Sequence, residues 1–187
     1  MAENKVQFNL KNVHYAPLTD EAKHTWGTPV HVPGSVAIAL EAQGEVSKFY
    51  ADGIVYYQSS SNNGYDGDLE MSLIPDQMLQ DIWGMAKVTT DNVVVENAND
   101  QAKSFALLFQ IDGDAANRFF ALYNCKATRP NVESKTNEDT KTPQTQKIKI
   151  SAAPMQDGNI KAHTCTDTAE MVKQNWFKNV YYHEAGK

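Results

Sequence analysis

Turn-forming dipeptides divide this chain into short segments, and this pattern constrains its fold more than any other feature. The dipeptides are Gln43-Gly44, Asp52-Gly53, Asn63-Gly64 and Asp157-Gly158. The segments between them are rich in β-branched and aromatic residues, which favour strands. A polar residue followed by glycine is typical of the tight turns that join antiparallel strands. The sequence therefore predicts a mainly β protein, an antiparallel β-sandwich or barrel.

Residues 35–58 contain the clearest strand pattern, with three successive strands expected there. The Asp-Gly dipeptide in the middle suits a type I′ turn, because both of its central residues need positive φ. Such a turn would pair Ala51 with Ile54 and Phe49 with Tyr56. This segment is therefore expected to contain a tight β-hairpin.

Two later strands are expected to be covered on both faces. Residues 104–111 form a continuous apolar run of strand length, and residues 118–128 carry aromatic side chains on both alternating faces. Two sheets packed face to face, or a sheet with a helix on one side, would supply the necessary cover.

One short amphipathic helix is expected at residues 75–84. Pro75 suits the first turn, and Gly84 can end the helix in a left-handed conformation. The pairs Met78/Ile82 and Leu79/Trp83 have i,i+4 spacing and would form one apolar stripe. This stripe needs a core to pack against.

The length and charge of the chain exclude several classes of function. The 187 residues suit one domain, and 17 basic against 23 acidic residues give a net charge of −6. That charge argues against a protein that binds nucleic acid by neutralising phosphates. There is no apolar run of about 20 residues that could span a membrane, and no signal-peptide pattern, so we expect synthesis in the cytoplasm. Cys125 and Cys165 are expected to be buried free thiols, with one disulfide between them as the alternative.

Catalytic and metal-binding motifs are not recognisable in the sequence. Asp66, Asp68 and Glu70 resemble the start of a calcium loop, but the later ligands of such a loop do not follow. Strand alternation explains their spacing, since it places them and Ser72 on one solvated face. We therefore expect no catalytic residues, no metal site and no cofactor.

Seven segments, taken in order, resemble a known family. They read KNVHYAPL, GTPVHVPGSVAIALEA, KFYADGIVYYQ, GYDGDLEMSLIPD, FALLFQIDGD, RFFALYNCKATRP and PQTQKIKISAAP. Together they are similar to the major tail tube protein of long-tailed, siphovirus-type bacteriophages and prophages of Gram-positive bacteria. The resemblance covers about residues 6–165 and does not extend to the segment after Asp167.

This resemblance implies a structural virion protein of the phage tail rather than an enzyme. Members of the family have a β-sandwich or barrel-like core with one helix and form homohexameric rings. The rings stack into a tube around a tape-measure protein, next to tail terminator and distal tail proteins, and DNA passes through the lumen at ejection. Residues 1–11 would then be an N-terminal arm, residues 12–166 the tail tube domain, and residues 167–187 a C-terminal arm or helix.

The acidic strand face is the candidate lining of the lumen. In such rings the inner strands of neighbouring subunits join into one barrel, which removes exposed sheet edges. Asp66, Asp68, Glu70 and Ser72 would face the lumen, where negative charge would repel phosphates and let DNA slide. An acidic outer face that keeps the tube soluble is the alternative.

A long polar loop, residues 129–146, and the two terminal arms are the candidate inter-subunit contacts. The C-terminal segment carries four aromatic residues that need a partner surface, in cis or in trans, and Asp167 and Glu170 there resemble a capping box. The candidate contact residues are Arg129, Asn131, Glu133, Lys135, Trp176, Phe177, Tyr181 and Tyr182.

A different class of function stays open from the residues alone. Exposed aromatics such as Tyr56, Tyr57 and Tyr65 could stack on sugar rings, as in a carbohydrate-binding or host-receptor-binding module of a phage tail. No residue pattern indicates a concave binding site for such a ligand.

Overall fold

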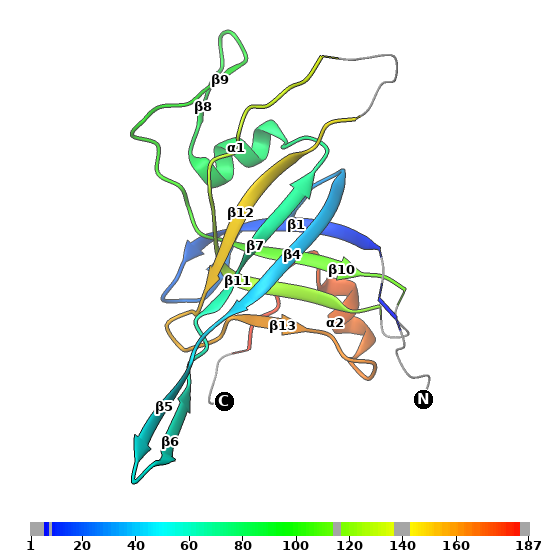
Figure 1. Cartoon of the computed structure of the whole chain (residues 1–187). Coiled ribbons are helices and arrows are strands. Elements are labelled where there is room, and N and C mark those ends of the chain that lie inside the picture. Colours follow the sequence, from blue (N-terminus) through cyan, green and yellow to red (C-terminus); the bar gives the residue numbers. More distant parts are fainter. Residues whose placement is uncertain (1–5, 8, 114–116, 137–142, 184–187) are drawn as a thin grey trace.

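The computed structural model describes residues 6–7, 9–113, 117–136 and 143–183 (Figure 1). Its strands are antiparallel and it is mainly β, which confirms the predicted class. The elements are β1 (Leu10–Asp20), β2 (Thr25–Trp26), β3 (Val30–His31), β4 (Ser35–Gln43), β5 (Val46–Ala51), β6 (Ile54–Ser60), β7 (Gly64–Met71), α1 (Asp76–Trp83), β8 (Ala86–Val88), β9 (Val93–Val95), β10 (Phe105–Ile111), β11 (Phe119–Ala127), β12 (Gln146–Ala153), β13 (Lys161–His163) and α2 (Glu170–Asn175).

The main sheet crosses over itself to make two layers. Its strand order is β2-β1-β10-β11-β12-β7-β4, with β3 added to β1 and β13 to β11. In Figure 1 the layer of β12, β7 and β4 crosses in front of the layer of β1, β10 and β11. Strand β11 makes this possible because it changes partners along its length. Residues Phe120–Leu122 pair with β13, and residues Asn124–Ala127 pair with β12.

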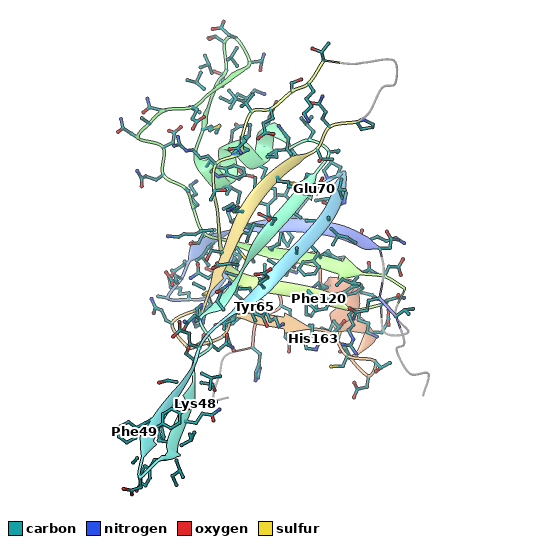
Figure 2. All side chains as sticks on the ribbon, viewed as in Figure 1. Lys48, Phe49, Tyr65, Glu70, Phe120 and His163 are labelled. Atoms are coloured by element: carbon teal, nitrogen blue, oxygen red, sulfur yellow. The ribbon has the colours of Figure 1, made fainter. Side chains whose placement is uncertain are left out.

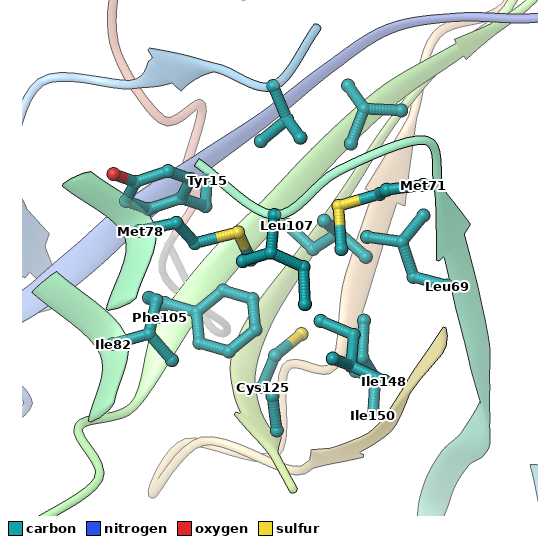
Figure 3. Close-up of a cluster of buried hydrophobic side chains, with 14 of the residues drawn as sticks. Tyr15, Leu69, Met71, Met78, Ile82, Phe105, Leu107, Cys125, Ile148 and Ile150 are labelled. Carbon is teal, nitrogen blue, oxygen red and sulfur yellow. The ribbon is translucent and has the colours of Figure 1, made fainter. Parts of the chain in front are cut away.

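The principal core lies between these layers and against α1. Strand alternation puts Ile148 and Ile150 of β12 inside, beside Leu69 and Met71 of β7 (Figure 3). Side chains from β1, β10 and β11 meet them from the other layer. As predicted, β10 is covered on both faces, because a second apolar cluster lies behind it.

Helix α1 closes one end of the core and matches its predicted position. Pro75 is the N-cap residue, and Gly84 ends the helix with φ 75° while its N–H bonds to the Gln80 carbonyl. The buried Trp83 donates its indole N–H to the Ala127 and Thr128 carbonyls, 3.3 and 3.1 Å away. On β1, Tyr15 donates to Asp81 at 2.8 Å, so the helix is tied both to β1 and to the end of β11.

The C-terminal segment packs on the outer face of β1, β10 and β11. Helix α2 is short and begins after Ala169, whose side chain makes no capping hydrogen bond, so the predicted Asp167–Glu170 capping box is wrong. Six helical residues supply little intrinsic stability. The segment is held instead by buried aromatics, which form the second apolar cluster with Tyr123 and Ala121.

The structure confirms the predicted turn of the β5–β6 hairpin, but only part of the predicted strand register. Ala51 pairs with Ile54 across Asp52 and Gly53, whose φ angles of 53° and 80° fit a type I′ turn. Phe49 pairs with Tyr57 instead of Tyr56, because the register shifts between Phe49 and Tyr50. Such a bulge adds one residue to one strand and bends the hairpin locally.

The two cysteines differ from each other. Cys125 is a buried free thiol, as predicted, and burial raises its pKa to about 12. Cys165 is also free but exposed, so the prediction of burial is wrong for it. It follows β13 at the edge of the sheet, where no apolar layer covers it.

Candidate interaction surfaces

The outer face of the β4–β7–β12 layer carries the predicted acidic row. Asp66, Asp68 and Glu70 point outward on β7, while Leu69 between Asp68 and Glu70, and Met71 after Glu70, are buried. Ser72 lies just beyond the end of the strand, and Leu73, which strict alternation would place inside, is exposed. The alternation therefore holds only as far as the strand itself.

A row of lysines lies beside the acidic row. Sequence reasoning missed these lysines. Directly opposed residues of neighbouring strands point to the same side. The register places Lys147 opposite Glu70 and Lys149 opposite Asp68, and Lys126 of β11 continues the same face. The alternating KIKIS motif of residues 147–151 was the signal for these outward lysines, but their partner strand depends on tertiary pairing.

Glu70 is the most strongly engaged of these acids. It accepts a hydrogen bond from the Thr145 hydroxyl, and the Lys147 ammonium lies 3.3 Å from its second oxygen. These two partners hold the pKa of the Glu70 carboxyl below its usual range. The Thr145 hydrogen bond joins the end of the 129–146 loop to β7.

The face as a whole is close to neutral. Its four carboxylates belong to Glu41, Asp66, Asp68 and Glu70, and its three ammonium groups to Lys126, Lys147 and Lys149, so the sum is −4 + 3 = −1. A groove of about 670 Å³ runs over it, lined by acidic and basic side chains together. The acidic surface expected from β7 alone is therefore a mixed-charge surface.

Strand β4 forms one edge of the main sheet. It is nine residues long and pairs only with β7 among the described residues. It contains neither lysine nor proline, the residues that commonly protect an exposed edge. Its outer face carries the small side chains of Ala37 and Ala39, followed by Glu41.

The β5–β6 hairpin extends away from the body of the molecule (Figure 1). Among the residues that the structure describes, its two strands pair only with each other. Seven large apolar side chains on it are exposed by 44% to 70%, and none belongs to either buried cluster. They are Val46, Phe49, Tyr50, Ile54, Val55, Tyr56 and Tyr57.

The described part of the 129–146 loop is largely exposed, and hydrogen bonds connect its two halves. Arg129 makes an ion pair with Glu96 at 2.7 Å, which links the loop to the β8–β9 hairpin. Asn131 donates to Glu133, and the Lys135 backbone exchanges two hydrogen bonds with the Gln144 side chain. All four predicted contact residues of this loop are thus solvent-accessible. Residues 137–142 lie outside the described part of the chain.

The four C-terminal aromatics find their partner surface largely in cis. Trp176 is only 2% exposed and donates its indole N–H to the Phe120 carbonyl at 3.3 Å. Phe177 stacks on the His14 ring, with centroids 4.7 Å apart, and Tyr182 donates to Asp157 at 2.7 Å. Burial lowers the pKa of His14, which is half-buried under this contact. Tyr181, 41% exposed, is the most accessible of the four.

An apolar groove of about 390 Å³ lies along this same segment. Its lining includes Val172, Trp176 and Val180, with the Tyr181 ring stacked on Trp176 at a centroid distance of 5.4 Å. Met171 is 73% exposed at its edge. Apolar side chains therefore line this hollow together with the polar Asn175 and Asn179.

The terminal arms are described only in part. Of the predicted N-terminal arm, residues 1–5 and 8 lie outside the described residues, and β1 already begins at Leu10. Residues 184–187 are also outside. Within the described ranges, no group of three or more His, Cys, Asp or Glu side chains is placed to hold a metal ion.

The helices in the described ranges include none with the length and apolar character needed to cross a bilayer.

Comparison with known proteins yields similarity in structure only. No protein-family model matches the sequence, and no curated protein matches it. A chain from the cryo-EM structure of the anti-feeding prophage cap, the tube-terminating cap, has 9% identity and a TM-score of 0.49, over 86% of this chain and 93% of that chain.

Two further solved structures align over similar lengths. A chain of the anti-feeding prophage baseplate has 8% identity and a TM-score of 0.49, over 89% of this chain and 99% of that one. A chain from the sheath/tube terminator of an extracellular contractile injection system, PVC, has 9% identity and a TM-score of 0.47, over 86% and 99%. With TM-scores below 0.5, we draw no functional conclusion from this likeness.

Proposed function

We propose that this protein is a structural, self-assembling component of a phage tail and has no enzymatic activity. Six copies form a ring, and the rings stack into the tail tube through which DNA is ejected. The sequence resemblance to major tail tube proteins suggests this role. The observation that carries it is the long edge strand β4, which is regular from Ala37 to Gln43 and contains neither lysine nor proline, so that its edge is open to pairing with another chain.

The physical argument starts from the backbone of β4. An edge strand of nine residues presents a row of unpaired N–H and C=O groups, which readily pair with any other strand. Lysine, proline and β-bulges are the common protections of such an edge, whereas β4 has a register shift only at its start, between Ser35 and Ala37, and a single charge, Glu41. Pairing between copies satisfies the edge, and a closed ring leaves no free edge at all.

The mixed-charge face would line the lumen in this arrangement. If β4 of each copy pairs with a different strand of the next copy, as a six-fold ring requires, the β4–β7–β12 layers form one continuous wall with Asp66, Asp68 and Glu70 on one of its surfaces. Six such faces carry 6 × (−1) = −6, with acids and lysines interleaved. DNA phosphates would meet a nearly neutral lining, which offers no net electrostatic attraction. Ser72 would lie at the end of this row.

The remaining contacts follow from the exposed elements. Arg129, Asn131, Glu133 and Lys135 lie on a solvent-accessible loop and would contact a neighbouring copy. Of the C-terminal aromatics, Tyr181 is the most accessible for that purpose. By resemblance, the tape-measure, tail terminator and distal tail proteins would be the other partners, and the protein would reside in the virion.

Electron microscopy of the concentrated protein tests this proposal. We expect rings or tubes with six-fold symmetry, and we expect Ala39→Lys to abolish them, because it adds charge to the β4 edge. The variant should stay folded, since the new side chain would face Asp68 across the ladder. Ala39→Ser is the matched control and should still assemble. A protein that stays monomeric at every concentration would contradict the proposal.

Chemical labelling tests whether the mixed-charge face lines the lumen. In a Cys165→Ser background, Asp68→Cys should react with a small maleimide both before and after assembly. A protein-sized maleimide should react with the unassembled variant only. Equal labelling of assembled tubes by the large reagent would place this face outside the lumen.

Carbohydrate binding is the second candidate, and one observation favours it. Tyr56 and Tyr57 are largely exposed on the β5–β6 hairpin and could stack on sugar rings. Tyr65 does not extend this platform, because it is half-buried and Lys161 covers its ring at 4.3 Å. Glycan binding that is lost in Tyr57→Ala, by a protein that never assembles, would favour this candidate.

A further inference from the structure

Two histidine rings lie in contact across strands β1 and β3. His14 of β1 and His31 of β3 are directly opposed residues of these antiparallel strands. Opposed residues point to the same side of a sheet. The two ring centroids are 4.9 Å apart, and the ring planes are tilted by 57°. The residues are far apart in sequence, so the pairing of β1 with β3 is what brings the two rings together.

The backbone pairing holds these two side chains close to each other. The Val32 N–H donates to the Val13 carbonyl at 2.8 Å, which makes Val13 and Val32 a hydrogen-bonded pair. The adjacent pair, His14 and His31, is then a non-hydrogen-bonded pair, in which opposed side chains lie closer together. Val13 and Val32 are buried in the principal core, so the two histidines lie on the opposite face.

Hydrogen bonding determines which nitrogen of His14 carries the proton. Its Nδ1 lies 2.8 Å from the Asn12 carbonyl oxygen. A carbonyl oxygen only accepts, so Nδ1 is the protonated nitrogen, and the neutral ring keeps a lone pair on Nε2. Metal-binding histidines usually donate their other N–H in this way, because the bond fixes the tautomer and the ring orientation. Phe177, stacked on the His14 ring at a centroid distance of 4.7 Å, restricts the ring further.

The surroundings of His14 favour its neutral form. Burial lowers the pKa of this ring, and the neighbouring His31 ring lowers it further. Neutral imidazole is the form that binds a metal ion, so little proton competition is expected near neutral pH. His31 is exposed, and an ion can therefore reach the pair from solvent.

The spacing of the two rings fits a single transition-metal ion. Zinc–nitrogen bonds are about 2.0–2.1 Å long, so two imidazole rings on one tetrahedral ion have their centroids about 5 Å apart. The observed distance of 4.9 Å fits this arrangement. Imidazole nitrogen suits zinc, nickel and copper, whereas calcium and magnesium prefer oxygen ligands.

We propose that His14 and His31 form a binding site for one divalent transition-metal ion, Zn²⁺, Ni²⁺ or Cu²⁺, with water in the remaining coordination positions. The ion joins β1 to β3, a strand of only two residues, and closes the segment of residues 15–30 between its two ligands. An ion that binds only the folded chain stabilises it by mass action. This site goes beyond the proposed self-assembly and does not depend on it.

Calorimetric titration of Zn²⁺ into the untagged protein tests the site. A Cys165→Ser parent removes the exposed thiol, which could bind zinc by itself. We expect one ion per chain. His31→Gln should weaken binding by about tenfold or more, because the loss of even an outer partner of a metal ligand costs about 10–100-fold in affinity. His31 is exposed, so this variant should fold like its parent.

His163→Gln is the matched control variant. His163 is also exposed, but its ring stacks on Phe120 instead of on a second histidine (Figure 2). This variant should bind Zn²⁺ as tightly as the parent does. Equal affinity of His31→Gln and the parent would overturn the proposal, as would equal weakening in both variants. No binding by the parent at millimolar Zn²⁺ would also overturn it.

Electron paramagnetic resonance of bound Cu²⁺ gives an independent readout, because the spectrum reports nitrogen ligands. The parent should show two imidazole nitrogens on the ion, and His31→Gln should show one. The same nitrogen count in both proteins would contradict the site. A thermal scan provides the effect on stability: Zn²⁺ should raise the melting temperature of the parent and of His163→Gln but not that of His31→Gln. An equal rise in all three would refute the role of this pair.

Discussion

Replacement of Trp176 by alanine should destabilise the whole protein. The indole is 2% exposed, lies 6.3 Å from the Phe119 ring by centroid distance, and stacks on Tyr181. Trp176→Ala removes this packing and the hydrogen bond to the Phe120 carbonyl. Truncation of a buried aromatic to alanine lowers the free energy of unfolding by about 3–5 kcal/mol. We expect a loss in this range because Trp176 is buried and its indole N–H has a hydrogen-bond acceptor, the Phe120 carbonyl.

The effect should extend beyond the one side chain. Helix α2 contains no buried residue and no capping side chain, so it does not hold the C-terminal segment in place by itself. Trp176 is the most buried side chain of that segment in the second apolar cluster. Its loss should therefore loosen the segment and uncover Tyr123 and its neighbours on the sheet.

Urea denaturation followed by circular dichroism measures this change, with a thermal scan as a second readout. For a domain of this size, about 2–4 °C is lost per kcal/mol, so the melting temperature should fall by roughly 6–20 °C. Met171→Ala is the matched control: it lies in the same segment, is 73% exposed, and should cost about 0.5 kcal/mol or less.

Equal stability of the two variants would refute the reasoning. It would show that the segment is an arm, free to cover a neighbouring copy, as the sequence alone allowed. The same logic applies to truncation after Thr166. From sequence, the core is expected to survive that truncation, whereas the packing on β10 and β11 predicts a marked loss of stability.

Three further predictions concern single sites. In the native protein only Cys165 should react rapidly with a thiol reagent at neutral pH, and Cys125 should become reactive on unfolding; two reactive thiols in the native state would contradict the burial. Gly84→Ala should lower the free energy of unfolding by about 1–2 kcal/mol, because φ is 75° and a Cβ would lie 3.1 Å from the Gln101 carbonyl oxygen. Gly84→Asn should lower it less, because asparagine tolerates the left-handed conformation better. Urea denaturation measures both changes. The pKa of His14 is lowered by burial in the fold, so its contribution to stability is present above about pH 6.5 and is lost as the pH falls through the folded-state pKa. The fall in melting temperature between about pH 7.5 and about pH 5 should therefore be smaller in His14→Phe than in the wild type.

Local periodicity predicted the elements well where neighbours in sequence decide the structure. The spacing of apolar residues around Met78 and Ile82, with Gly84 after them, was sufficient for α1. The alternation of acids with Leu69 on β7 was likewise sufficient for an outward acidic row. The failures came where one residue shifts a register, as at the bulge beside Phe49, or where a strand ends, as after Met71.

The candidate surfaces depended much more on which strands become neighbours. The sequence by itself determined that residues 66–72 have an acidic side, that residues 35–58 contain a tight hairpin at Asp52-Gly53, and that the C-terminus carries four aromatics in need of a partner. Only the tertiary structure decided that lysines of β12 neutralise most of that acidic side, that the hairpin stands free, and that Trp176 is buried in cis. The physical reason is that side-chain direction follows from the backbone period of each element. Charge balance and exposure instead depend on contacts between residues far apart in the chain.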